Sequence, residues 1–483
     1  MKKLTKRVKN LIIAGCVLAI LGGTLATLLI TGRNNYNKTN SSSSEEQRIK
    51  LVDKKPADVT KLHIKNPLDE YTIEQVSNDE WKIGALSEFE QSHAFLEYAV
   101  QYASSISATE MVEESPEDSG KYGLSSPQAS FEETFKDGTV FKLFIGDKTP
   151  DKNGYYVKTG DTGAVYACVS SAIDDYFLAK REKYIDTKLT DALDTDTSSS
   201  SYNSTLAVFV TGEIELAIVP NEEFDKLPDD DPATAFVSTY KMIKPYTDAV
   251  DSDLVNQFIQ GLYGLSAKSV EIANPTAQQL RDCGIDKPTY ALNIKYEKSE
   301  KDTVILFGKK NDDGYIYAYK DKTPLIYKVN VLSLPFIDMD PFSLVSRSVI
   351  LPYIDYVKTM VIEYGSNKYQ FDLTGNGDEL VVRHGSDTID QAIFKQYYQL
   401  LLDARREEPA DKEYKGTPSL TITYKYKNSS KKDDVIRFIP ASSRKVYITV
   451  NGEGSSLMRT LFVDKVILET ANLVSGKNVD IKW

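Results

Sequence analysis

Histidine, cysteine and tryptophan are scarce in this chain of 483 residues, which contains three, three and two of them, respectively. The histidines are His63, His93 and His384, and their positions match no close metal-binding spacing such as H-E-x-x-H. Zinc sites need clustered ligands, so we expect surface or packing roles for these side chains. No metal site and no cofactor is therefore predicted.

The small number of cysteines also limits disulfide formation. Cys16 lies in an apolar N-terminal segment, which leaves Cys168 and Cys283 as the one pair that could form outside the cytoplasm. These two residues occupy different positions in the repeated segments described below, so no pattern requires them to meet. Free, buried thiols are the expected state, and pairing stays open.

Motifs of common enzymes are missing or out of context. The sequence has no G-x-x-x-x-G-K-[ST] loop and no G-x-S-x-G elbow, although spacing alone leaves a Ser-His-Asp triad open. The fragments KTG (158–160), SYN (201–203) and SSRK (442–445) resemble those of penicillin-binding enzymes in reversed order, and we interpret them as chance matches. The chain is predicted not to be an enzyme, and no catalytic residue is assigned.

Two acidic stretches lack the spacing of a calcium site. Residues 221–232 (NEEFDKLPDDDP) concentrate six acidic side chains, and Asp378 and Glu379 lie in a second stretch. Neither follows the EF-hand pattern, which places oxygen ligands at defined positions. We expect solvated loops, and residues 221–232 form an insertion that could also contact a partner.

The one long uncharged apolar run covers residues 11–31, and its 21 residues suffice to span a hydrocarbon core of about 30 Å. Residues 1–10 hold five cationic side chains and no acidic one, and such a flank stays in the cytoplasm. We predict a cytoplasmic flank and single transmembrane anchor over residues 1–33 and a polar tether over 34–47. The bulk of the chain would then lie outside the cell membrane.

Two alternatives for the apolar segment stay open. The letters IAGC at 13–16 resemble a lipoprotein box, but most of the apolar run follows Cys16 instead of preceding it. A secretory signal cleaved after Ala26 is the second alternative, although the apolar run continues to Ile30.

Beyond residue 33 the chain is strongly acidic. The net charge is −12, and the first 33 residues carry six cationic groups and no acid, so the remainder carries −18. This charge argues against binding to nucleic acid or to an anionic membrane surface.

One sequence motif recurs along the chain. KYGLSSP at 121–127 opens a stretch that returns as DCGIDKP at 282–288, and a weaker third copy has KGTP at 415–418. After each of the corresponding prolines, alternating apolar and polar residues predict a strand, as in ASFEETF, ALNIKY and LTITYKY. Before each proline, a helical pattern follows further strand patterns.

Strands and helices are therefore segregated, which predicts an α+β fold with mostly antiparallel sheets. We expect three related β-rich units over residues 48–190, 205–350 and 351–483, each with one main helix. A Ser-rich linker over 191–204 would separate the first two units.

Apolar spacing predicts the buried face of each main helix. In the first unit, Ser87 and Glu90 have the spacing of a capping box. The predicted faces are Phe95, Tyr98, Tyr102 and Ile106 in the first helix, Leu254, Phe258, Leu262 and Leu265 in the second, and Ile389, Ile393, Tyr397 and Leu401 in the third.

The repeated motif is predicted to be a structural corner. Gly123 permits a left-handed backbone, and Pro127 fixes φ at the start of the following strand. Asp137 and Gly138 supply the positive φ angles of a tight hairpin turn after that strand.

The motifs KYGLSSP, LFIGDK, GYYV and VYACV, together with the upstream YTIEQVSNDEWKIG, resemble the bacterial domain of unknown function (DUF) 4340 family. The resemblance is best over residues 58–180, fair over 205–345 and thin after 351. Cys283 replaces Tyr122 in the second copy, and the third lacks the glycine of LFIGDK, so no site at those positions can be common to all three.

The resemblance implies a single-span extracytoplasmic protein whose gene lies beside ABC-type export components. We therefore expect an accessory or scaffold protein, with an ABC-type permease or another envelope protein as its partner. It supplies no catalytic residues. The alternative is a ligand-binding receptor or cell-wall-acting enzyme of the envelope, which the 30 tyrosines keep open because such residues suit carbohydrate or peptide surfaces.

Overall fold

The computed structural model describes residues 48–77, 80–193, 204–226, 237–297, 302–428 and 431–483. The predicted anchor (11–31), the tether (34–47) and most of the predicted linker (191–204) lie outside these residues. Within the described ranges, no helix is both long and apolar enough to cross a membrane.

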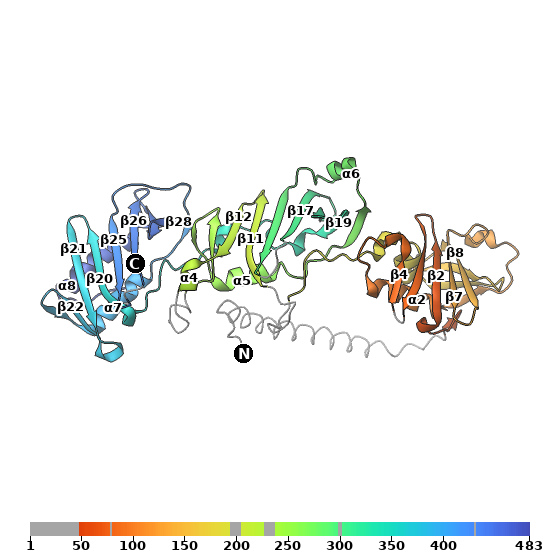
Figure 1. The fold of residues 1–483 in the computed structure, drawn as a ribbon, viewed down its shortest axis with the longest axis horizontal. Helices are drawn as coiled ribbons and strands as arrows, with labels where there is room; N and C mark the ends of the chain where they lie inside the picture. The colour runs from red at the N-terminus through yellow and green to blue at the C-terminus, as the bar shows by residue number, and fades with distance from the viewer. Residues whose placement is uncertain (1–47, 78–79, 194–203, 227–236, 298–301, 429–430) are drawn as a thin grey trace.

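Three large antiparallel sheets lie in a row and follow one another along the chain (Figure 1). The first has the strand order β4-β3-β2-β7-β8-β9-β10-β6. Its strands are β2 (Val59–Lys65), β3 (Glu70–Ser77), β4 (Glu80–Ile83), β6 (Glu110–Glu113), β7 (Ala129–Phe135), β8 (Val140–Lys148), β9 (Gly154–Thr159) and β10 (Val165–Val169). A small fourth sheet pairs β1 (Ile49–Lys50) with β5 (Ser107–Ala108).

The second sheet has the order β14-β13-β12-β11-β16-β17-β18-β19-β15. Its strands are β11 (Thr205–Gly212), β12 (Leu216–Pro220), β13 (Tyr240–Lys244), β14 (Asp248–Ala249), β15 (Ser269–Ala273), β16 (Tyr290–Tyr296), β17 (Thr303–Lys310), β18 (Tyr315–Lys320) and β19 (Leu325–Asn330).

The third sheet has the order β23-β22-β21-β20-β25-β26-β27-β28-β24. Its strands are β20 (Val357–Tyr364), β21 (Asn367–Thr374), β22 (Val381–His384), β23 (Asp387–Ile389), β24 (Glu408–Pro409), β25 (Leu420–Tyr426), β26 (Asp434–Pro440), β27 (Lys445–Val450) and β28 (Glu453–Arg459).

Helices are few beside these strands. The longer ones in the described ranges are α2 (His93–Ser104), α5 (Ser252–Gln260), α7 (Gln391–Leu402) and α8 (Thr460–Val474), and the shorter ones are α3 (Ser170–Ala172), α4 (Glu222–Lys226) and α6 (Ala277–Asp282). One continuous apolar core joins buried residues of the first and second sheets, and another fills the third. The predicted strand-rich, antiparallel architecture is confirmed.

The strands predicted after the three prolines are β7, β16 and β25. For β7 and β25 the bounds agree with the alternating segments, 129–135 and 420–426. Gly138 has a φ of 82° in the hairpin between β7 and β8, and the Asp137 carboxylate accepts a hydrogen bond from the Thr139 amide at 2.9 Å. The alternating pattern predicted these strands, but Asp137 does not have the positive φ predicted for it. The turn closes with a bond of 2.9 Å from the Gly138 amide to the Phe135 carbonyl, so only Gly138 is left-handed.

The predicted start of the first helix was wrong, and its predicted face was wrong in part: Tyr102 is half-buried, and Ile106 is buried but lies beyond the helix. Helix α2 buries Leu96, Ala99, Val100 and Ala103, whereas Phe95 and Tyr98 are 38% and 54% exposed. The small alanines allow the helix to lie close to the sheet, so the larger aromatic rings point outward.

The capping box at the start of α2 does not form. The Gln91 amide bonds both the backbone amide and the carbonyl of Ile83, at 2.9 and 3.1 Å, and holds residues 83–91 in a compact turn. The helix therefore begins at His93, after Ser92, and neither Ser87 nor Glu90 caps it.

The other two helices agree in part with the predicted faces. In the second, α5 ends at Gln260, so the buried Leu262 and Leu265 lie beyond it, and Leu254 is 42% exposed because Val255 and Ile259 face the core instead. In the third, Tyr397 and Leu401 are buried as predicted, but Phe394 replaces Ile393 in the buried face, and Ile389 belongs to β23.

The repeated corner has the predicted backbone. Gly123 and Gly284 have φ angles of 68° and 74°. A Cβ atom on Gly123 would lie 2.6 Å from the Asp147 side chain, so both conformation and space require glycine there. The residue after each proline donates a side-chain hydrogen bond to a carbonyl on the returning strand, in the pairs Gln128–Gly146, Thr289–Gly308 and Ser419–Phe438.

A short backbone pairing lies just before each large sheet. We call residues 49–51, 187–189 and 347–349 the lead segments, because each precedes one large sheet and pairs with the stretch after that sheet's main helix. The paired residues are Lys50 with Ser107, Lys188 with Ser266, and Ser348 with Arg405. The next amide in each lead segment donates across the pair, from Leu51 to Ile106 at 3.0 Å, Leu189 to Leu265 at 2.8 Å, and Val349 to Ala404 at 3.2 Å.

A buried ion pair crosses the junction between the second and third sheets. Arg406 and Asp248 are 2.5 Å apart, and each side chain is 4% exposed. The Asp248 carboxylate also accepts from the Ser456 hydroxyl at 2.6 Å, and the Arg406 guanidinium donates to the Val349 carbonyl at 3.3 Å. Hydrogen bonds from both sides satisfy the two charges.

We expect Arg406→Met to destabilise the third sheet by about 3–5 kcal/mol, because it leaves the Asp248 carboxylate buried without its cation. The chain has two tryptophans, so a Trp81→Phe background leaves Trp483 as the reporter of the third sheet. Urea unfolding followed by its fluorescence measures the effect. Arg383→Met, at an exposed position of β22, is the control, and an equal loss in both variants would contradict the prediction.

Candidate functional site

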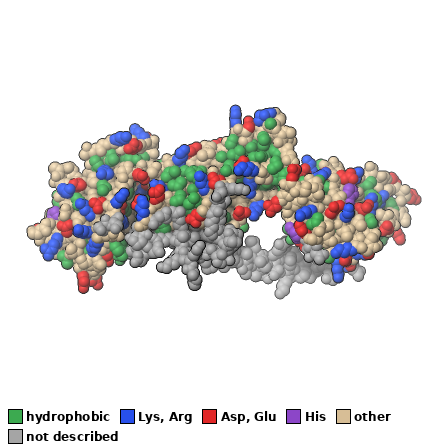
Figure 2. All heavy atoms as spheres, in the orientation of Figure 1, with side chains coloured by type: hydrophobic (Ala, Val, Ile, Leu, Met, Phe, Trp, Pro, Cys, Tyr) green, Lys and Arg blue, Asp and Glu red, His purple; other side chains and the backbone are tan. Residues whose placement is uncertain are grey.

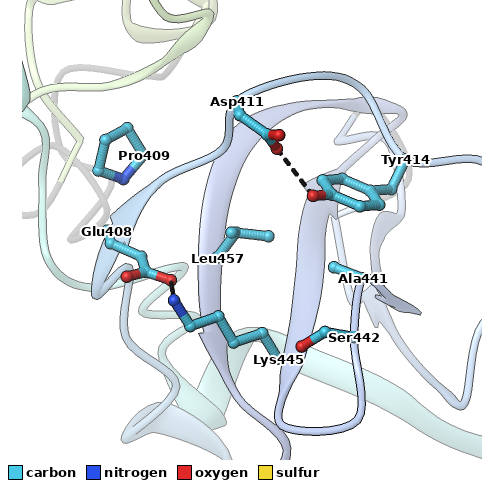
Figure 3. Close-up of a pocket in the computed structure, with 8 residues that line it drawn as sticks. All are labelled: Glu408, Pro409, Asp411, Tyr414, Ala441, Ser442, Lys445 and Leu457. Atoms are coloured by element: carbon cyan, nitrogen blue, oxygen red, sulfur yellow. Dashed lines mark hydrogen bonds and ion pairs between the residues drawn. The ribbon is translucent and has the colours of Figure 1, made fainter.

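A concavity of about 410 Å³ opens on the third sheet, between the segment after β24 and the turn that joins β26 to β27 (Figure 3). Its lining combines charged, hydroxyl and apolar groups from three parts of the chain. They are Glu408, Pro409, Asp411, Tyr414, Ala441, Ser442, Lys445 and Leu457.

An ion pair closes one side of the concavity. Glu408 is on β24 and Lys445 begins β27, and their charged groups are in direct contact across β28 (Figure 3). Both side chains remain 40–45% exposed. A surface pair of this kind contributes about 0–1 kcal/mol to stability, so both groups can exchange partners at little cost.

Tyr414 forms the opposite side. Its hydroxyl donates to the Asp411 carboxylate at 2.7 Å, and this bond lowers the pKa of Asp411 and raises the pKa of Tyr414. The Tyr414 ring lies 5.7 Å from the Tyr447 ring, and the ammonium of Lys412 lies 5.2 Å from the Tyr414 centroid. The apolar floor includes Leu457, which is 7% exposed.

The charged and hydroxyl groups of the concavity have nearby partners. The Lys445 ammonium faces Glu408, and the Ser442 hydroxyl accepts from the Arg444 amide at 3.3 Å. The serine and lysine of the SSRK fragment therefore line one concavity, and the bond between them is a backbone bond of 3.1 Å from the Ser442 amide to the Lys445 carbonyl. An ammonium, a carboxylate and a tyrosine over an apolar floor can hold a short peptide or a sugar.

The three histidines lie on separate elements. His63 on β2 contacts Thr72 at 3.0 Å, His93 begins α2, and His384 at the end of β22 contacts the Gln370 carbonyl at 2.9 Å. In the parts of the chain that the structure describes, no group of three His, Cys, Asp or Glu residues could hold a metal ion.

The remaining sequence candidates are dispersed as well. The KTG fragment ends β9, and SYN lies outside the described residues. Asp378 and Glu379 are in a 3₁₀ turn, and of the acidic insertion 221–232 only residues up to 226 are described, with α4 among them.

Both described cysteines are free and buried. Cys168 is on β10 of the first sheet, and Cys283 follows α6 beside the second. Burial raises the pKa of the Cys168 thiol to about 12, so this group is an unreactive thiol at neutral pH.

A titratable residue that sequence analysis missed is buried in the first sheet. Glu133 on β7 is 0% exposed, and neither carboxyl oxygen has a partner among the described residues. Leu62 on β2 and Phe141 on β8 lie opposite it in the sheet. Burial raises the pKa of Glu133 to about 8, so the carboxyl is protonated at neutral pH.

The sequence contains a signal for this residue. Glu132 and Glu133 are consecutive in a strand, so they point to opposite faces, and one of them must face the core. Counted from the proline of each corner, Ile294 and Tyr424 occupy the same position as Glu133, and both are buried. The position is therefore a core position, and only the first sheet has an acid there.

A comparison with protein families matches the model described as "Domain of unknown function (DUF4340)" to residues 81–201 and 241–415, more than half of the chain. Searches of curated proteins and of solved structures give no match.

We expect the stability of the first sheet to fall between pH 4.5 and about 8. The unfolded chain releases the Glu133 proton near pH 4.5, and the folded chain retains it to about pH 8. One such proton contributes a slope of about 1.4 kcal/mol per pH unit. In Glu133→Gln and Glu133→Met this contribution should disappear, so both gain stability relative to the parent as the pH rises.

Urea unfolding at several pH values, followed by the fluorescence of the buried Trp81 in a Trp483→Phe background, measures this slope. The matched control is Glu132→Gln, because Glu132 lies on the other face and pairs with Lys142 at 3.1 Å. Equal slopes in the parent and both Glu133 variants would show that Glu133 is ionised in the folded protein.

Proposed function

This chain belongs to the DUF4340 family, and on that premise we propose that it is a membrane-anchored extracytoplasmic accessory protein built from three related units. The proposal rests on one observation. The three large sheets lie in one row, and a similar backbone pairing lies at each of the two junctions between them. A row of fixed length suits a protein that holds partners at defined positions.

Several features support a common plan for the three units. The three large sheets have corresponding strand orders. In each sheet, the strand after the corner lies beside the first long strand. Each corner has the same side-chain bond after its proline. A lead segment also precedes each large sheet, which supports starts of the second and third units near residues 187 and 347.

The position of the row at the membrane is a proposal from sequence. The apolar run 11–31 with its basic flank would form the anchor, and the 14-residue tether 34–47 would allow a reach of about 20 Å. The first unit would then lie near the bilayer, within reach of an ABC-type permease such as those implied by the family resemblance. An acidic chain beyond residue 33 suits a protein partner better than a lipid or nucleic-acid surface.

A second candidate function is favoured by the concavity of the third sheet (Figure 3). If the third unit binds a ligand there, the protein is an envelope receptor for a peptide or sugar. Figure 2 shows that charges of both signs are interspersed on one face of the protein. Hydrophobic side chains gather there on the middle sheet, near β17 and β19.

The topology gives a first test. Protease added to intact protoplasts should remove residues beyond the tether, because the basic flank would keep only the N-terminus inside. An epitope at the C-terminus reports the cleavage, and a cytoplasmic protein in the same cells is the control. Full protection of the C-terminus would contradict the proposed orientation.

The partner gives a second test. We expect the full-length protein, purified from native membranes in mild detergent, to bring an ABC-type permease with it. A variant with the third unit's concavity altered, Lys445→Glu, should retain the permease, because the proposed contact is at the other end of the row. Purification without a permease, together with no permease after cross-linking in cells, would favour the receptor function.

A further inference from the structure

The second and third sheets carry a tyrosine at the same place on the face turned away from their main cores. Strands β18 and β27 have corresponding places in the strand orders. On these strands, Tyr317 and Tyr447 precede Ala318 and Ile448, which face the main apolar cores. Side chains alternate along a strand, so both tyrosines face the other side of their sheets.

In the second unit, the chain itself fills the space over this tyrosine. The segment between β15 and Pro288 contains α6, and it contributes Leu280, Cys283 and Ile285 to a small apolar cluster with Tyr317. Aliphatic and thiol side chains therefore occupy the outer face at this place.

In the third unit, the corresponding segment is shorter. It covers residues 410–417, against 274–287 in the second unit, and these eight described residues form no helix. Ala410 and Tyr414 are its members in the cluster with Tyr447. The concavity of about 410 Å³ lies here, with Leu457 in its floor (Figure 3), so a place that is filled in the second unit is open to a ligand in the third.

Charged groups lie on two opposite sides of this concavity (Figure 3). On one side, the Asp411 carboxylate accepts from the Tyr414 hydroxyl at 2.7 Å. Asp411 is exposed, and a carboxylate has about four acceptor positions, so it can accept from a further donor. On the other side, Lys445 contacts Glu408, and its ammonium has three N–H donors, so it can also donate to a ligand.

We propose that this concavity binds the free amino end of a short peptide. The Asp411 carboxylate receives the terminal ammonium, Lys445 donates to a carbonyl of the peptide, and the first apolar side chain lies on Leu457. The proposal rests on the receptor function, the second candidate above, and names the ligand class of that site.

A sugar fits this site less well. Stacking of a sugar ring needs an open aromatic face, but the Tyr414 ring already lies 5.7 Å from the Tyr447 ring and 5.2 Å from the Lys412 ammonium. A neutral sugar also has no cation for Asp411, whereas an ammonium forms a charge-assisted hydrogen bond, which is about twice as strong as a neutral one.

Affinity selection with the full-length protein in detergent micelles tests the proposal. The protein is offered a tripeptide library with free amino ends, the same library with acetylated amino ends, and a mixture of N-acetylglucosamine oligosaccharides. Mass spectrometry identifies the retained compounds. We expect free-ended peptides with an apolar first residue to be retained and their acetylated forms to be lost, because acetylation removes the ammonium.

Titration calorimetry with the most strongly retained peptide then tests the assigned side chain. Asp411→Asn should weaken binding on the order of tenfold, because it removes the charge and keeps the shape. The matched control is Glu413→Gln, which makes the same change two residues further on. Glu413 is 65% exposed and pairs with Lys415 at 3.4 Å outside the concavity, so the Kd should stay unaltered.

Equal retention of free and acetylated peptides would overturn the proposal, as would an unchanged Kd in Asp411→Asn. Retention of the sugars without the peptides would show that the ligand class is wrong and that the receptor function stands. If neither is retained, the proposal and the receptor function both fail, and the accessory function is unaffected.

Discussion

Backbone hydrogen bonds join each lead segment to the stretch after the next main helix, and two of these pairings lie where one large sheet follows another. A single such bond contributes only about 0.5–1.5 kcal/mol net, but it uses main-chain atoms and so does not depend on which side chains are present. Ser107, Ser266 and Arg405 can therefore occupy the same place in three pairings. The same backbone pairing can therefore precede each of the three large sheets although the residues in it differ.

Side chains make the two junctions different. The first has one buried aromatic ring, Tyr327, close to Asp186 of the first unit. The second has the Asp248–Arg406 ion pair with its serine hydroxyls. Buried ion pairs contribute little net stability, since desolvation offsets their attraction, but a wrong partner leaves a charge unpaired. The second junction thus allows one register between its two sheets and disfavours others.

The first and third sheets, at the two ends of the row, differ in chemistry. A polar concavity with Tyr414 lies on the third sheet. In the first sheet, the buried Glu133 makes the core sensitive to pH, whereas the corresponding core positions in the other sheets are Ile294 and Tyr424.

The sequence by itself determined the features that depend on neighbouring residues: the alternation in β7 and β25, the left-handed Gly123, the Asp137–Gly138 turn and the scarcity of catalytic motifs. Only the tertiary structure decided which side of α2 is buried, because Ala99 and Ala103 set its distance from the sheet and turn Tyr98 outward. It also decided the partners of Asp248, since Ser456 is 208 residues away in the chain. Periodicity describes one element at a time, and contacts between distant elements depend on how whole sheets meet.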